Sequence, residues 1–178
     1  MANLKPFRDY DEHDVINLFA VNATTANKGT VVTADSVGVN LKDALALENL
    51  SPYGNTLSAE FNVPWTVSPA ASGATQGQIV GLLLKDVRQL DENGEQLKFN
   101  PRKAAEMDVI ISGQACPILT KGLVLVNGIV GTPGFGSGAA VSDAGGGDLK
   151  VVAYGSATVG KFLGPKNDEG YALLKVEL

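Results

Sequence analysis

Thiol and imidazole groups are nearly absent from this sequence, which has one cysteine, Cys116, and one histidine, His13, in 178 residues. A single cysteine forms no intramolecular disulfide and supplies neither a CxxC redox pair nor a thiolate zinc cluster. A nucleophilic cysteine needs a histidine partner, and His13 lies far away in an N-terminal segment. We therefore expect Cys116 to be a small buried apolar side chain, as free cysteines most often are.

Runs of basic residues and long apolar runs are also missing. The chain has 14 Lys and Arg against 19 Asp and Glu, a formal net charge of −5, whereas nucleic-acid binding depends on cations that displace phosphate counterions. The longest apolar runs, IVGLLL and GLVLV, are far shorter than the ~20 residues of a membrane-spanning helix, and the start is not signal-like. These absences predict a soluble protein, made in a cytoplasm, that binds neither nucleic acid nor membrane.

Signatures of catalysis are missing as well. His13 lies among four acidic residues in RDYDEHDV, but alternate residues of an extended chain point to opposite sides, so these groups converge on one metal ion only if the segment forms a loop. GFGSG lacks the strand, helix and acidic residue of a dinucleotide site and the GK[ST] ending of a P-loop. No GxSxG motif appears. We expect no enzymatic activity, no metal and no cofactor, and a hydrolase that uses His13 is the alternative from another class.

Apolar residues are numerous enough for one core, and glycine is in excess. Apolar residues make up 44% of the chain and charged residues 19%, and folding of a chain of this length buries about 70% of its surface. Glycine accounts for 21 residues, which exceeds the roughly 7% average and predicts many turns. We expect a single β-rich domain, residues 29–178, preceded by an N-terminal arm, residues 1–28.

Strand patterns dominate after the arm. The apolar-polar alternation of YALLKVEL is typical of a half-buried strand, and further strand candidates are VVTADSVGVN, FNVPWTV, QIVGLLLKDV, GLVLV, DLKVVAYG and ATVGKFLG. Asn93-Gly94 predicts a hairpin that pairs 78–88 with 96–99. NLKDALALENL and, after Pro101, NPRKAAEM are short helix candidates. The sequence predicts a mainly β fold: a small β-barrel or β-sandwich domain with one or two short helices, an extended N-terminal arm and a long Gly-rich loop.

Two further segments have more than one interpretation. Residues 131–148, GTPGFGSGAAVSDAGGGD, are too glycine-rich for a strand or a stable helix, because ordering glycine costs more backbone entropy than ordering any other residue. We expect one long loop there, either mobile or ordered by a neighbouring subunit. Trp65 is either a packing residue of a core or interface, which we favour because aromatic side chains commonly have that role, or a carbohydrate-stacking platform.

The apolar residues of the N-terminal arm are the candidate partner-binding residues. They follow a charged segment and fall on both faces of an extended run, so they need cover from two sides. Burial of each large apolar side chain is worth about 1.5–3 kcal/mol, so several together would anchor the chain to a partner. The predicted contacts are Val15, Ile16, Leu18, Phe19 and Val21.

Three stretches of the chain resemble virion structural proteins of tailed bacteriophages, in particular small capsid decoration, or cement, proteins. The stretches are KPFRDYDEHDVINLFA, KDVRQLDENGEQLKFNPRKAAEMDVIISGQACPILTKG and VGKFLGPKNDEGYALLKVEL. The resemblance implies a β-rich domain, often oligomeric, that attaches in many copies to the outside of an assembled head. It carries over no catalytic residues.

From this resemblance we expect a non-enzymatic protein on the head surface of the virion, synthesised in the cytoplasm of the host bacterium. Its partner would be the major capsid protein, which it would stabilise, and it would form a homo-oligomer, with a trimer favoured. The alternative is a tail or head-fibre component with a host-attachment role, through exposed Trp65 or the Gly-rich loop. Copy number separates the two, because decoration needs hundreds of copies per head and a fibre needs a handful.

Overall fold

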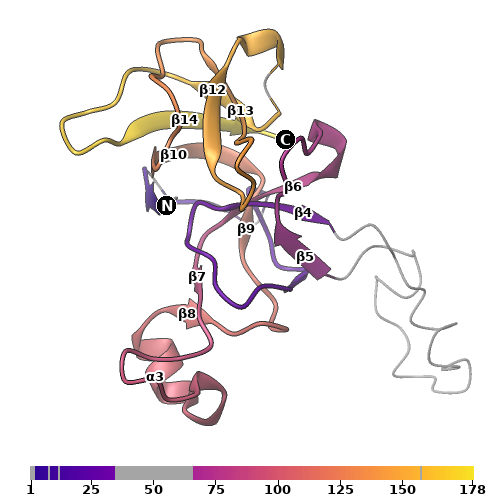
Figure 1. The fold of residues 1–178 in the computed structure, drawn as a ribbon, viewed down its shortest axis with the longest axis vertical. Helices are drawn as coiled ribbons and strands as arrows, with labels where there is room; N and C mark the ends of the chain where they lie inside the picture. Colours follow the sequence, from indigo (N-terminus) through magenta and orange to yellow (C-terminus); the bar gives the residue numbers. More distant parts are fainter. Residues whose placement is uncertain (1–2, 8, 12, 35–65, 157) are drawn as a thin grey trace, which may run out of the picture.

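The computed structural model describes residues 3–7, 9–11, 13–34, 66–156 and 158–178. Within these residues the strands form two six-stranded sheets and one two-stranded sheet (Figure 1), which confirms the mainly β fold expected from the sequence. The helix candidate at 40–50, Trp65 and parts of the strand candidates at 31–40 and 61–67 lie outside the described residues.

The first sheet holds the C-terminal half of the chain together with the N-terminal strand. Its strand order is β1-β10-β14-β13-β11-β12, and all neighbouring pairs are antiparallel. The strands are β1 (Asn3–Pro6), β10 (Lys121–Asn127), β14 (Ala172–Glu177), β13 (Gly160–Phe162), β11 (Gly138–Val141) and β12 (Leu149–Val152). In β14, Ala172, Leu174 and Val176 are buried and the residues between them are half-buried, so the predicted alternation is confirmed.

The second sheet has the order β2-β9-β6-β4-β5-β3, with one parallel pair, β3 and β5. Its strands are β2 (Val15–Ile16), β9 (Ile118–Leu119), β6 (Ile79–Leu83), β4 (Val31–Ala34), β5 (Thr66–Pro69) and β3 (Ala20–Val21). A smaller lobe below it in Figure 1 contains the parallel pair β7 (Asp86–Val87) and β8 (Val109–Ile110) and the helix α3 (Pro101–Glu106). Three-residue 3-10 turns complete the described elements: η2 (Gln76–Gln78), η3 (Leu97–Phe99) and η4 (Tyr154–Ser156).

Both faces of the second sheet are covered by apolar side chains. Leu82 and Leu119 belong to a core shared with residues of the first sheet such as Leu174, whereas Leu83 and Ile118 belong to a second core with Phe19, Val21, Val87 and Cys116. Leu82 and Leu83 are neighbours on β6, and both are 0% exposed. Because successive side chains of a strand point to opposite faces, β6 must be apolar throughout, and its sequence, IVGLL, is.

The lobe around α3 partly follows the sequence prediction. Pro101 opens α3, and the Asn100 side chain caps it by accepting the Lys103 N–H, at 3.3 Å. Leu90 and Gln96 form a β-bridge across the predicted Asn93-Gly94 turn. The second strand of that hairpin was predicted wrongly, because 97–99 turn into η3, which buries Leu97 and leads directly to the cap of α3.

The Gly-rich segment is not one continuous loop. Residues 138–141 form β11, which lies between β12 and β13, and all four of its residues are buried. The expectation that glycine excludes a strand here was wrong, because pairing on both sides and the small side chains of GAAV outweigh the intrinsic preference. Glycines with positive φ, among them Gly136 and Gly145, lie in the two shorter loops that flank β11.

Candidate binding surface

Phe19 and Val21, two of the predicted partner-binding residues, belong to the core of their own chain. Phe19 is 8% exposed and Val21 is 0% exposed, and both pack in the second core. Their backbone is bonded to the segment before β9: the Val21 N–H donates to the Gln114 carbonyl, and the Phe19 carbonyl accepts the Cys116 N–H, both at 3.0 Å. Both residues contact their own chain, which corrects their assignment to a partner.

The remaining three predicted residues lie on or beside β2, an edge strand of the second sheet. Val15 is half-buried against the first core, and its backbone pairs with that of Leu119. Ile16 is 36% exposed and Leu18 is 43% exposed. Alternation along the strand explains the difference, because Val15 faces inward and its neighbour does not. Of the five predicted residues, Ile16 and Leu18 therefore keep a surface for a partner.

Turn hydrogen bonds join Asp11, His13 and Asp14, which precede β2. The Asp11 side chain accepts the His13 N–H at 2.8 Å, and the Asp11 carbonyl accepts the Asp14 N–H at 3.1 Å. The Asp14 carbonyl in turn accepts the N–H and the hydroxyl of Thr120, at 2.8 and 3.0 Å. His13 is exposed. In the described part of the chain, which leaves out Glu12, no three His, Cys, Asp or Glu side chains are grouped to hold a metal ion.

Cys116 has the environment of a core residue. It is 0% exposed, and its Sγ lies 3.4 Å from the Phe19 carbonyl oxygen. Burial raises the pKa of the Cys116 thiol to about 11. Because the thiolate is the reactive form, Cys116 is a poor nucleophile at neutral pH, and its interpretation as a buried apolar side chain is confirmed.

The loop before β11 presents a large aromatic side chain to solvent. Phe135 is 85% exposed, more than any other large apolar residue that the structure describes. Its neighbours are fixed by hydrogen bonds: the Gly136 N–H donates to the Phe162 carbonyl at 2.9 Å, and the Ser137 N–H donates to the Gly134 carbonyl at 3.1 Å. Phe135 therefore projects from a hydrogen-bonded turn, and sequence reasoning missed it because the segment was interpreted only as a loop.

A lysine secures the start of the same loop. The Lys166 ammonium donates to the carbonyls of Ile129 and Gly131, each at 2.8 Å. Between these two residues Val130 is 56% exposed, although its backbone bridges to β12 at Lys150. The apolar side chains of Val130 and Phe135 thus stand on a backbone that is bonded to the first sheet at several points.

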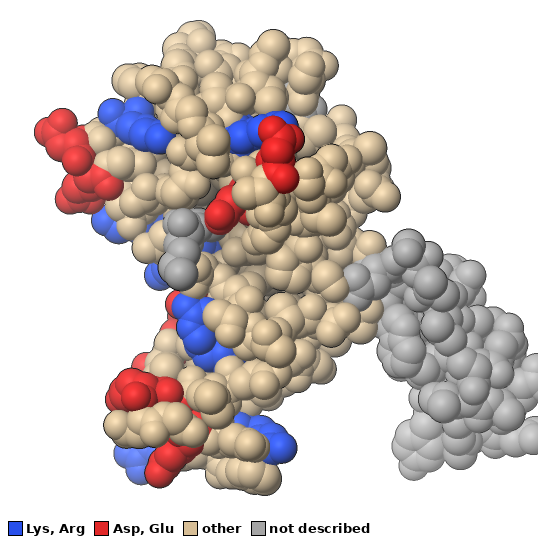
Figure 2. Space-filling view, in the orientation of Figure 1, with Lys and Arg blue, Asp and Glu red and all other residues tan. Residues whose placement is uncertain are grey.

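A second exposed apolar site lies on the α3 lobe. Phe99, at the end of η3, is 78% exposed, and Leu90 is 50% exposed. On the described part of the face in Figure 2, acidic and basic side chains are interspersed over this lobe and over the upper sheet, and most of the surface between them is uncharged. On the described part of this face, neither the α3 lobe nor the upper sheet has a surface patch of only acidic or only basic side chains.

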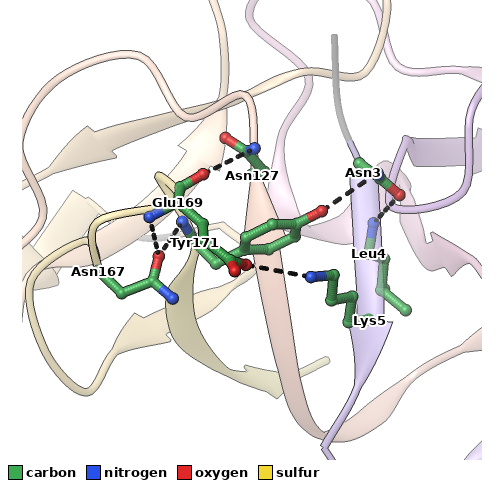
Figure 3. Close-up of polar contacts among 7 residues, drawn as sticks. All are labelled: Asn3, Leu4, Lys5, Asn127, Asn167, Glu169 and Tyr171. Atoms are coloured by element: carbon green, nitrogen blue, oxygen red, sulfur yellow. Dashed lines mark hydrogen bonds and ion pairs between the residues drawn. The ribbon is translucent and has the colours of Figure 1, made fainter.

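The N-terminal strand is tied to the turn before β14 by side chains (Figure 3). The Asn3 amide donates to the Tyr171 hydroxyl at 3.3 Å, and the Lys5 ammonium pairs with Glu169 at 3.3 Å while lying 4.2 Å from the centre of the Tyr171 ring. Asn167 closes the turn, because its Oδ1 accepts the N–H groups of Glu169 and Tyr171, at 3.1 and 2.8 Å. Asn127 on β10 donates to the Glu169 carbonyl at 3.5 Å.

No protein family matches this chain, and no curated protein matches its sequence. No helix in the described parts of the chain is long and apolar enough to cross a membrane.

Proposed function

We propose that this chain is a non-enzymatic structural protein of a tailed-phage virion, which binds the major capsid protein on the outer surface of the assembled head. The resemblance of three sequence stretches to capsid decoration proteins motivates the proposal. The observation that carries it is Phe135, an 85% exposed aromatic side chain on a hydrogen-bonded turn. Such a side chain is suited to binding a partner.

Burial of Phe135 against capsid subunits would supply affinity at a small ordering cost. Full burial of a phenylalanine side chain is worth about 1.5–3 kcal/mol. Binding also costs free energy when loops must become ordered, and a turn that is already hydrogen-bonded reduces that cost. A protein that binds only the assembled head lowers the free energy of the assembled state, so the head becomes more resistant to heat and denaturant.

The test is co-sedimentation of the purified chain with undecorated heads. We expect Phe135→Ser to weaken binding about tenfold or more, because each ~1.4 kcal/mol corresponds to a factor of ten. Phe99→Ser is the matched control, since Phe99 is 78% exposed but belongs to the α3 lobe. Circular dichroism should show that both variants remain folded.

Four results would count against the proposal in different ways. Equal binding of Phe135→Ser and wild type would remove Phe135 from the interface, and selective loss in Phe99→Ser would move the interface to the α3 lobe. Failure of the wild-type chain to bind heads at all would overturn the decoration role. Wild-type chain found in a handful of copies on tails or at one vertex would instead support a tail or head-fibre component with a host-attachment role.

A further inference from the structure

The sequence contains two Asn-Gly pairs, Asn93-Gly94 and Asn127-Gly128. In such a pair the glycine has no side chain to hinder its backbone nitrogen, which can attack the side-chain amide of the preceding asparagine. The sequence alone does not separate the two pairs. The structure does, because the two glycine N–H groups have different hydrogen-bond partners.

At Gly128 the backbone nitrogen lies against the side chain that it would attack. The Gly128 N–H donates to Oδ1 of Asn127 at 2.6 Å, so the nitrogen and the side-chain amide carbon are close neighbours. Gly128 follows the last residue of β10 and has a φ of +73°. Both Asn127 and Gly128 are half-buried, which leaves room for water to enter.

At Gly94 the backbone nitrogen is held by another residue. The Gly94 N–H donates to the Asp91 carbonyl at 3.2 Å, and the Asn93 N–H donates to the Asp91 side chain at 2.8 Å. The turn is therefore fixed at both residues of the pair by Asp91. An attack by the Gly94 nitrogen on the Asn93 side chain requires the bond from the Gly94 N–H to the Asp91 carbonyl to break first.

One other described asparagine has the same local hydrogen bond as Asn127. The Leu4 N–H donates to Oδ1 of Asn3 at 2.9 Å. Leu4 has a bulky side chain, is 1% exposed and lies in β1, which pairs with β10. Its peptide is fixed by packing, so Asn127 combines this close approach with an unhindered glycine and Asn3 does not.

We propose that Asn127 is a site of spontaneous deamidation in the folded protein. The Gly128 nitrogen forms a bond to Cγ of Asn127, the Cγ–Nδ2 bond breaks, and ammonia leaves with the proton of the former Gly128 N–H. A water molecule then opens the resulting succinimide at either carbonyl and leaves aspartate or isoaspartate at position 127. The net change consumes one water and releases one ammonia, with no oxidant or reductant.

The modification changes the contacts of β10 with the turn at 167–171. The Asn127 amide donates to the Glu169 carbonyl at 3.5 Å (Figure 3), and a carboxylate has no proton for that bond. The new charge also lies beside a turn that already contains Asp168 and Glu169. Isoaspartate adds one carbon to the main chain where β10 ends opposite Asn3 of β1. The proposal concerns this chain alone and does not depend on its role in a virion.

The test is peptide mapping by mass spectrometry after incubation of the intact chain in warm, mildly alkaline buffer. We expect the Asn127 peptide to accumulate aspartate and isoaspartate several-fold faster than the Asn93 peptide. The same chain unfolded in urea is the control, because both pairs should then react at similar rates. Gly128→Ala should slow the reaction at Asn127 without changing that at Asn93.

Two results would overturn the proposal. In the folded chain, equal or faster conversion of Asn93 would show that the Gly128 contact does not select the site. Conversion of Asn127 only under unfolding conditions would show that the native structure protects it. Both of these results are measured on the wild-type protein. The test therefore remains decisive even where Gly128→Ala impairs folding.

Discussion

Asp91 shows how much structure can depend on a single carboxylate. Its side chain is 1% exposed and accepts the N–H groups of Asn93 and Glu95, each at 2.8 Å, and the Lys103 ammonium at 2.6 Å. These bonds, first the one from Lys103, lower the pKa of Asp91, and Asp91 raises the pKa of Lys103. The carboxylate thus joins the turn at Asn93-Gly94 to α3.

The lowered pKa of Asp91 predicts a loss of stability in acid. Above its ordinary pKa of 3.8 the carboxylate is ionised in both states and its bonds stabilise the fold. As the pH falls from about that value through the lower pKa of the folded state, the unfolded chain binds the proton more readily, so this stabilisation is lost. We expect Asp91→Asn to lower the Tm at neutral pH and to reduce the further fall of Tm in acid.

The measurement is thermal unfolding followed by circular dichroism from neutral to strongly acidic pH. Glu92→Gln is the control, because Glu92 also pairs with Lys103 but its side chain is 71% exposed. Parallel acid profiles for wild type and Asp91→Asn would contradict the assignment of this effect to Asp91.

Gly81 on β6 is required by a close approach of two strands rather than by its backbone angle. A Cβ atom at this position would lie 2.3 Å from the Leu119 carbonyl oxygen on β9. We expect Gly81→Ala to destabilise the fold by about 1–3 kcal/mol, as overpacking of a core does. Gly77→Ala is the matched control, since a Cβ there meets no atom within 4 Å. Urea denaturation of the two variants checks the difference, and equal stabilities would contradict it.

At the scale of elements, local pattern predicted much of the fold. The alternation in β14, the proline at the start of α3 and the turn at Asn93-Gly94 were identified because each signal lies within a few residues. Strand β11 was missed because its stability comes from β12 and β13 on either side, and the sequence does not show which strands pair. The exposed Phe135 was missed for the same reason, since its presentation depends on bonds to Phe162 in β13.

Strand β11 also changes what is expected of a loop deletion. If residues 131–148 formed one long loop, as expected from the sequence, shortening residues 134–147 would leave the domain folded. Because that deletion removes β11, whose four residues are buried between two strands, we now expect it to abolish the fold. Deletion of residues 143–145 alone should be tolerated, because loop closure costs change by only about 0.6 kcal/mol per doubling of length. Circular dichroism and urea unfolding of both deletions provide the check, and a folded longer deletion would contradict it.

At the scale of the whole molecule, the N-terminal segment connects the two sheets. β1 belongs to the first sheet, β2 and β3 belong to the second, and Leu4 and Val21 are buried in different cores. The sequence showed that this segment needs cover on both faces, but it did not show that the chain itself supplies most of that cover. The need for cover on two faces was therefore predicted correctly. What supplies the cover could not be predicted, because it comes from residues about a hundred positions away along the chain, such as Leu119 and Val126.

Truncation and surface substitution of this segment should therefore have opposite effects on folding. A chain that begins at Asn22 lacks three strands, and we expect it to be unfolded. An arm that contacted only a partner could instead be removed without loss of the fold. The double variant Ile16→Ser and Leu18→Ser should stay folded, because these side chains are 36% and 43% exposed. Circular dichroism of the two proteins tests the contrast, and a folded truncation would show that β1 to β3 are dispensable.

The double variant also tests whether the edge strand β2 contacts a neighbouring subunit or the capsid. Edge strands carry unpaired backbone groups that are suited to intermolecular contact, and Ile16 and Leu18 add apolar area beside them. We expect the variant to weaken assembly of the proposed trimer or its binding to heads, measured by light scattering and by co-sedimentation. Its control is Leu178→Ser, because Leu178 is 39% exposed and comes directly after β14 in the other sheet. Unchanged assembly and binding in the double variant would remove Ile16 and Leu18 from the interface, whereas loss in both variants would show an effect of exposed apolar area in general.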